Sequence, residues 1–222
     1  MNAFDATWAS TIAGSDAQLE LHDLRLRIRP VRADDKALIR EAFTRLSERS
    51  RYLRFFTPMH GLTEPMLTAL TEVDYIDRFA WVALACEGDH EALAGVARYV
   101  RLEEPRSAEV ALTVVDPYQG RGIGHLLLNA LVLAAVQAGL SRFEGEILGE
   151  NLAIRAVLAN AGAELRLSER GSLRFAFDLA PRADALRAHP MYDVLHRLAL
   201  GASVASPAEP WPCGVSRPTH FA

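Results

Sequence analysis

The stretch Leu112–Val136 reads LTVVDPYQGRGIGHLLLNALVLAAV, and it decides the fold. An apolar run stops at Asp116, three glycines follow at positions 120, 122 and 124, and the chain then becomes almost wholly apolar again. This order predicts a buried strand, a glycine-rich loop and a buried helix. Backbone N–H groups of such a loop and of the first helical turn can point at one anion, and the helix dipole favours negative charge there. The loop therefore predicts a phosphate site, with a simple tight turn as the alternative.

Two common phosphate motifs do not match this loop. A P-loop places Lys and Ser or Thr after its last glycine, whereas this chain has His125 and Leu126. A dinucleotide fingerprint opens the first strand–helix–strand unit of a parallel sheet, but this loop comes about halfway along the chain, after a series of strands. Both readings are disfavoured.

The composition of the chain limits the classes of protein to which it can belong. The chain has 222 residues, which is enough for one sizeable domain, and its net charge of -4 gives no electrostatic case for binding nucleic acid. No apolar run approaches the roughly 20 residues that span a bilayer, and the first residues lack the pattern of a secretory signal. The two cysteines, Cys86 and Cys213, are too few for a disulfide framework. We expect a cytoplasmic protein without a membrane or nucleic-acid partner, and no metal site, because no histidine is spaced for one.

Hydrophobic periodicity predicts an alternation of helices and strands. Residues 23–31 alternate, with three leucine or isoleucine side chains on one face and Arg25, Arg27 and Arg29 on the other. Helices are expected over 33–47, 47–56 and 63–73, followed by an antiparallel meander of strands over 79–86, 92–100 and 108–115. After the glycine loop, we expect a helix over 123–138, a strand over 141–149, a helix over 151–162 and a hairpin over 163–179.

The two ends of the chain are expected to lie outside the main domain. We predict a loose leader over 1–20, one domain over 21–180 and a C-terminal extension over 181–222, with a short helix followed by a flexible tail. The extension is expected to be dispensable for binding the co-substrate. Its alternatives are to cover a cleft, to form a homodimer with a second copy or to pack on the back of the domain.

The segment VVDPYQGRGIG carries a family resemblance. It resembles the GNAT superfamily of acyl-CoA-dependent N-acyltransferases, whose signature is Gln/Arg-x-x-Gly-x-Gly/Ala after a strand ending V-x-P-x-x-Q. The resemblance runs from about residue 23 to 179, and Asn151 and Gly162 match the limits of the later helix of that family. SERSRYLRFF, LTEVDYIDRFAWVAL and GVARYV are similar to the acetyltransferase domain of bacterial Pat-type protein-lysine acetyltransferases. The resemblance implies an α/β (α+β) fold: a mixed, mostly antiparallel sheet, splayed at residues 108–115 and 141–149, with helices on both faces.

The resemblance also implies acetyl-CoA as co-substrate. The residues expected to bind it are Val114, Val115, Gln119, Gly120, Arg121, Gly122, Ile123, Gly124, His125 and Asn151. Two of these have alternatives: His125 could simply be exposed beside Asn129, and Asn151 could be only a helix cap.

Acyl transfer to an amine requires a neutral amine and a donor for the developing oxyanion. A free lysine has a pKa of about 10.4, so a general base is useful near neutral pH. Glu109 shares a strand face with Ala111 and Thr113, and the matching Glu of the Pat-type domains is the base. The alternative is a solvated strand-end carboxylate paired with Arg98. The oxyanion donor is expected to be a backbone N–H near Val115.

The family resemblance supplies no general acid here. Many members carry a Tyr seven residues after the matching Asn, and this chain has Leu158 there. The expected acceptor is a primary amine, with protein lysine first and a small-molecule amine second. Four arginines, at 45, 49, 51 and 54, border the acceptor side in the resemblance, either as a site for acidic groups or as a solvated helix face. The rival from another class is a non-catalytic acyl-CoA-binding or sensing module.

Overall fold

A computed structural model describes residues 3–104, 106–168 and 171–204. One mixed sheet of nine strands runs through this part of the chain, in the order β7-β8-β6-β5-β4-β3-β2-β1-β9. The strands are β1 Asp16–Leu21, β2 Leu24–Pro30, β3 Arg78–Glu87, β4 His90–Arg101, β5 Ser107–Val114, β6 Arg142–Ile147, β7 Glu164–Leu167, β8 Leu173–Asp178 and β9 Ser203–Val204. The helices are α1 Ala3–Ala13, α2 Lys36–Thr44, α3 Glu48–Phe55, α4 Glu64–Thr71, α5 Ile123–Gln137, α6 Leu152–Asn160, α7 Leu179–Leu186 and α8 Tyr192–Ala199, with 3-10 turns η1 Ala33–Asp35 and η2 Asp116–Tyr118.

The predicted central meander is confirmed. β2, β3, β4 and β5 pair antiparallel in succession, as do β6, β8 and β7. The parallel pairs are β5 with β6 and β1 with β9. The sheet is therefore mixed and mostly antiparallel, as the resemblance implied.

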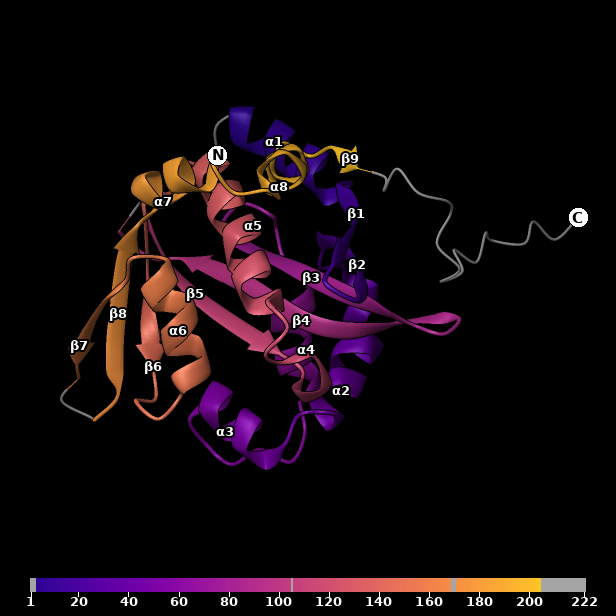
Figure 1. Ribbon diagram of the computed structural model, residues 1–222, viewed down its shortest axis with the longest axis vertical. Coiled ribbons are helices and arrows are strands. Elements are labelled where there is room, and N and C mark those ends of the chain that lie inside the picture. Colours follow the sequence, from indigo (N-terminus) through magenta and orange to yellow (C-terminus); the bar gives the residue numbers. More distant parts are fainter. Residues whose placement is uncertain (1–2, 105, 169–170, 205–222) are drawn as a thin grey trace, which may run out of the picture.

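The helix after the glycine loop lies at the centre of the fold. α5 is buried on nearly all sides, with Leu127, Leu131 and Ala134 fully buried. Helices α5 to α8 lie on one face of the sheet, and α2 and α4 lie on the other (Figure 1). A helix that is apolar all round must be covered all round, which explains why α5 needs helices as well as strands as neighbours.

The predicted loose leader is wrong. Residues 3–13 form α1, and β1 then pairs with β2 at the edge of the sheet. The Trp8 ring packs 5.9 Å from the Phe79 ring, centroid to centroid, and its Nε1 donates to the carbonyl oxygen of Ala199 at 3.2 Å. Ile12 is fully buried. Only a few large apolar side chains fix this helix, so its periodicity was weak in the sequence.

The predicted domain boundary at residue 180 is also wrong. α7 begins at Leu179, and both α7 and α8 pack on α5. Leu195, Leu198 and Ala199 of α8 are buried, and β9 adds a strand to β1. α1 and α8 lie side by side (Figure 1). The extension thus packs on the back of the domain, while the predicted flexible tail, with Cys213, lies outside the described residues.

One arginine of β2 is not on a solvated face. Arg29 is buried, and its two terminal nitrogens donate to the two carboxylate oxygens of Asp35 at 2.8 and 2.7 Å. The alternating pattern had predicted an exposed Arg29. The paired hydrogen bonds satisfy the guanidinium, which lets the charge remain away from water.

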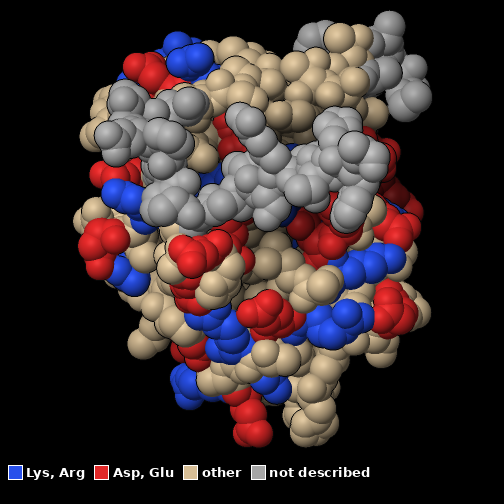
Figure 2. Space-filling view, turned by 90° about the vertical axis from the view of Figure 1, so that its right-hand side faces the viewer, with Lys and Arg blue, Asp and Glu red and all other residues tan. Residues whose placement is uncertain are grey.

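The charged side chains of the β1–β2 edge are mixed in sign. Figure 2 shows basic and acidic side chains interspersed over the described part of this side of the molecule. Arg27 pairs with Asp16 at 2.5 Å and with Glu91 at 3.3 Å. Within the described ranges, no helix is long and apolar enough to cross a membrane, and no three His, Cys, Asp or Glu side chains gather where they could hold a metal ion.

Candidate active site

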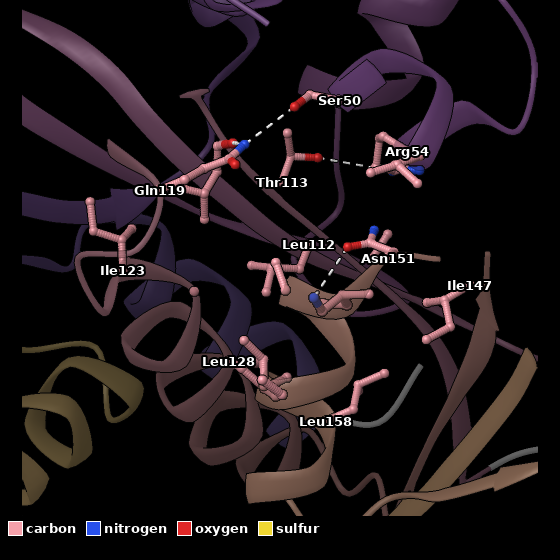
Figure 3. Close-up of a pocket in the computed structure, with 18 of the residues that line it drawn as sticks. Ser50, Arg54, Leu112, Thr113, Gln119, Ile123, Leu128, Ile147, Asn151 and Leu158 are labelled. Atoms are coloured by element: carbon pink, nitrogen blue, oxygen red, sulfur yellow. Dashed lines mark hydrogen bonds between the residues drawn. The ribbon is translucent and has the colours of Figure 1, made fainter. Parts of the chain in front are cut away.

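A cleft opens where β5 and β6 separate. The two strands are paired only between residues 107–109 and 142–144. Beyond this point β5 stays with β4, and β6 stays with β8. A cavity of about 910 Å³ lies there, bounded by the carboxyl half of β5, the glycine loop, α3, the first turns of α5 and one face of α6. Figure 3 shows side chains from these elements around the same space. The predicted splay is confirmed.

The glycine loop forms one wall of this cavity, and each of two glycines has a conformation that disfavours a side chain. Gly120 has φ +72° and Gly122 has φ +84° at the N-cap of α5. Left-handed backbone of this kind favours glycine. A Cβ added to Gly124 would lie only 3.4 Å from Leu112 and 3.5 Å from Val157. Gly120, Gly122 and Gly124 therefore line the cavity without side chains of their own, next to Ile123.

Gln119 holds the loop in place. Its Nε2 donates to the carbonyl oxygen of Val114 at 3.0 Å and lies 3.3 Å from both Asp116 Oδ1 and Ser50 Oγ. The Ser50 contact joins the loop to α3 across the mouth of the cavity (Figure 3). Gln119 lines the cavity as predicted, and the hydrogen bonds assign its amide to positioning the loop.

Arg121 does not line the cavity in the described structure. Its guanidinium pairs with Asp23 in the β1–β2 turn, and this hydrogen bond lowers the pKa of Asp23. The side chain is thus used to attach the loop to the N-terminal hairpin. The prediction that Arg121 binds the co-substrate is not supported by its orientation here.

His125 lies at the cavity, partly buried, in the first turn of α5. Its Nε2 is 2.9 Å from Nδ2 of Asn160, and burial, with the nearby Arg182, lowers its pKa. The alternative of an exposed His125 beside Asn129 is wrong. Asn129 is buried and instead accepts from Arg182 of α7 at 2.7 Å.

Asn151, Ile123 and Leu158 all line the cavity. The Oδ1 of Asn151 accepts from the backbone N–H of Ile154 at 3.2 Å, so Asn151 is the cap of α6 as well as a cavity residue. Ile123 and Leu158 are buried and form part of the apolar floor. No general acid stands at position 158.

The oxyanion donor was predicted to be a backbone N–H near Val115, and the hydrogen bonds of β5 narrow the choice of N–H group. The Val115 N–H donates to the carbonyl oxygen of Ala94 at 2.9 Å, and the Val115 side chain is buried. N–H groups alternate between the two edges of a strand. The Val114 N–H therefore points away from β4, toward the side on which β6 has diverged. The Val114 N–H is therefore the group near Val115 that is directed toward the cleft.

Glu109 lies on β5 with its side chain exposed to the cavity. Its nearest strand partners are Val100 on β4 and Glu144 on β6. No ion pair between Glu109 and an arginine occurs in the described residues, and Arg98 instead donates to the carbonyl oxygen of Ala69 at 3.3 Å. The alternative of a Glu109–Arg98 pair is not observed, and the carboxylate stays available to an acceptor.

The structure adds cavity residues that sequence patterns did not single out. Glu146 of β6 accepts a hydrogen bond from Ser172 Oγ. His22, in the β1–β2 turn, lies beside Gly122, with its Nε2 3.9 Å from where a Cβ of Gly122 would be. Tyr118 also lines the cavity, but its hydroxyl donates to Glu87, and burial raises its pKa to about 12. His22 lies 98 residues before Gly120 along the chain, so no local motif could connect them.

Comparison with known proteins places this geometry in a family. The acetyltransferase (GNAT) domain family matches residues 25–164. The chain is 36% identical over 155 residues to the acetyltransferase Pat of Mycolicibacterium smegmatis, covering 69% of this chain and 46% of that protein. It thus spans about half the length of that relative.

Two solved structures show the same arrangement. The GNAT domain of S. lividans PAT superposes with a TM-score of 0.68 at 31% identity, covering 73% of this chain and 96% of that one. A putative acetyltransferase from Salmonella typhimurium, solved with its cofactor acetyl-CoA, has a TM-score of 0.55 at 18% identity and shares the fold, over 69% of this chain and 94% of that one. The chain belongs to the GNAT acetyltransferase family.

Proposed function

We propose that the protein transfers an acetyl group from acetyl-CoA to a primary amine, and that the amine is a protein lysine. The observation that carries this proposal is the cleft between β5 and β6, because it brings the glycine loop and Glu109 into one cavity. One end of the cavity suits a phosphate-bearing chain and the other offers a free carboxylate. The relative from Mycolicibacterium smegmatis, which is named an acetyltransferase, supports the same reaction class.

The glycine wall fits the diphosphate of acetyl-CoA. Two left-handed glycines and a third that lines the cavity without a side chain would let backbone N–H groups at the N-terminus of α5 face a bound diphosphate. Residues 120–124 would hold the diphosphate. Val114 and Asn151 would border the pantetheine arm, where the two strands have separated.

Glu109 is proposed as the general base. It accepts a proton from the acceptor ammonium, directly or through one water, and the free amine then attacks the thioester carbon. The C–N bond forms, the C–S bond breaks, CoA leaves as a thiolate, and the remaining excess proton on the attacking nitrogen passes to that thiolate. The Val114 N–H is proposed to donate to the oxygen that becomes negative. A thiol has a pKa of about 8.5, so its thiolate can leave without a tyrosine acid.

The cytoplasm is proposed as the setting of the reaction, because both proposed substrates would be present there. That setting brings acetyl-CoA and exposed protein lysines together.

The proposal is tested by acceptor profiling. Purified protein is incubated with isotope-labelled acetyl-CoA and a cell lysate, and mass spectrometry identifies labelled lysines. Glu109→Gln should lose most of this labelling, whereas Glu103→Gln, an exposed acid in the loop before β5, should keep it. Labelling equal to that in a sample without enzyme would contradict the lysine acceptor. Equal labelling by wild type and Glu109→Gln would contradict the base.

A further inference from the structure

Arg54 differs from the three arginines that precede it in and around α3. Three of the four are occupied: Arg45 pairs with Glu87 at 2.6 Å, Arg49 with Glu150 at 3.5 Å, and Arg51 donates to the carbonyl oxygen of Thr44 at 3.2 Å and lies over the Phe43 ring. Arg54 forms no ion pair with any carboxylate of the described residues. Arg51 also lacks a carboxylate partner, and Arg54 lies over the Phe55 ring at 5.1 Å, much as Arg51 lies over Phe43. What distinguishes Arg54 among the four is that it lines the cavity and has no carboxylate partner.

Arg54 lies in the wall of the cavity, in the last turn of α3. Its Nε donates to the hydroxyl of Thr113 at 3.1 Å, which directs the guanidinium toward β5 (Figure 3). Thr113 and Glu109 share one face of β5 by strand alternation. Because Nε is engaged by Thr113, the two terminal NH₂ groups form the end of the guanidinium that a bidentate partner would use.

Little negative charge lies near Arg54. Burial and the positive charge of Arg98 lower the pKa of Arg54 to about 10, and Glu109 is the carboxylate that acts against this. Burial and the positive charge of Arg78 likewise lower the pKa of Arg98, and the negative charge of Glu109 opposes this. At neutral pH, Arg54 is still charged. A partly buried cation without a paired anion is costly, and a carboxylate brought by a ligand would offset that cost.

Neither carboxylate of the cavity that the structure describes, Glu109 or Glu146, forms an ion pair with this cation, although the charge of Glu109 acts on it. Glu109 is at the amino-terminal part of β5, four residues before Thr113, and Glu146 lies across the cleft on β6, bonded to Ser172. A ligand with an amine at one end and a carboxylate at the other can therefore satisfy both regions at once. The amine would face Glu109 and the carboxylate would face Arg54.

Resting on the proposed function, we propose that Arg54 determines acceptor specificity by binding a carboxylate that lies close to the reacting amine. The preferred acceptor is then a lysine with a neighbouring aspartate or glutamate, and not a lysine in a basic stretch. Thr113 acts as a positioning residue that holds the guanidinium for this contact.

The test uses matched acceptor peptides with one lysine and the same sequence except for its flanks, which carry Glu, Gln or Lys. A matched pair of small amines, aspartate and asparagine, accompanies the peptides. In the wild type, kcat/KM for the Glu-flanked peptide should exceed that for the Gln-flanked peptide by about 10- to 100-fold, as expected for a hydrogen-bonded charge pair. Arg54→Gln should remove this preference, Arg54→Lys should restore part of it, and Arg54→Glu should shift it toward the Lys-flanked peptide.

Arg49→Gln is the matched control on the same helix, because the Arg49 side chain is 69% exposed and does not line the cavity. It should keep the wild-type preference. Equal kcat/KM for Glu- and Gln-flanked peptides in a folded wild type, or a preference that survives Arg54→Gln, would overturn the inference. Acetylation of aspartate over asparagine without any peptide would instead refute the protein-lysine acceptor and leave the Arg54 inference supported. Turnover of no acceptor would contradict both.

Discussion

The two walls of the cavity differ in whether backbone or side chains face the ligand space. The glycine wall, residues 119–125, presents mainly backbone, and its one charged side chain, Arg121, is turned to Asp23 and away from the cavity. The opposite wall presents side chains, with Arg54 and Thr113 on one part and Glu109 on another. A backbone wall suits a ligand that is the same in every turnover, such as a diphosphate. A side-chain wall can distinguish among acceptors.

The difference has a physical basis in the sheet. β5 is bonded to β4 along its whole length, so one edge of the strand is fixed. Its other edge is bonded to β6 over residues 107–109 only, which leaves the N–H of Val114 available to a ligand. The same separation creates space for a thioester and exposes the face that carries Glu109. Both walls therefore depend on one local feature of the sheet.

The largest effect is expected from removing the support behind the glycine wall. A chain that ends at Asp178 lacks α7 and α8, including four buried leucines, and each fully buried leucine contributes about 1.5–3 kcal/mol. The sum is comparable to the roughly 5–15 kcal/mol by which a typical domain is stable. We expect this chain to fail to fold, as judged by circular dichroism and urea unfolding. A chain that ends at Val204 is the control and should remain folded; full stability of the shorter chain would contradict the packing of α7 and α8 on α5.

The next effect concerns the apolar floor. Leu158→Ala should reduce the free energy of unfolding by roughly 2–5 kcal/mol, because the side chain is buried and leaves a cavity. Turnover per folded molecule should change little, because no proton is carried at this position. Leu167→Ala, at an exposed leucine of β7, should cost less than about 0.5 kcal/mol. Lost turnover with an unchanged melting temperature would show that Leu158 acts in the chemistry.

A third prediction addresses the glycine wall alone. Gly122→Val should weaken acetyl-CoA binding by about 100-fold, or about 3 kcal/mol, because the φ of +84° disfavours a β-branched residue and the side chain would stand at the diphosphate position. Gly139→Val is matched in strain, since Gly139 has φ +76° at the far end of α5 with open space around it. Isothermal titration should show wild-type affinity for the Gly139 variant. Wild-type affinity for Gly122→Val would rule out the loop as the diphosphate site.

The smallest effect is a dependence of stability on pH through His125. Burial lowers its pKa in the folded protein below the ordinary 6.5, so the unfolded chain takes up the proton first as pH falls. The contribution is complete above about pH 6.5 and decreases as pH drops toward the folded pKa. His125→Gln should therefore show a flatter decline in melting temperature between pH 7.5 and 5.5 than the wild type. The exposed His60→Gln should not, and parallel curves for wild type and His125→Gln would refute the linkage.

The glycine wall was predictable from sequence because its requirements are local. The left-handed glycines Gly120 and Gly122 and the start of α5 at Ile123 fall within four contiguous residues. The order of β3, β4 and β5 was predictable for the same reason, since short turns join neighbouring strands.

Features that depend on distant contacts were not predictable. Trp8 bonds to Ala199, 191 residues away, and this hydrogen bond joins α1 to α8. The burial of Arg29 was missed for another reason: its partner Asp35 is only six residues away, but strand alternation does not reveal the ion pair. That Arg45 and Arg49 form ion pairs and Arg54 does not depends on where the carboxylate partners lie. Such partners leave no periodic signal in the sequence.

The central claim is that the two walls have separate roles: the glycine wall binds acetyl-CoA, and the opposite wall binds the acceptor amine at Glu109. The most direct test is the turnover of Glu109→Gln with an accepted lysine peptide, with the acetyl-CoA affinity of the same preparation determined by titration. The account predicts a turnover about 10²- to 10⁴-fold below wild type, the usual range for loss of a general base, together with unchanged acetyl-CoA affinity. Full turnover across pH 6–9, or a loss of acetyl-CoA affinity that matches the loss of turnover, would contradict it.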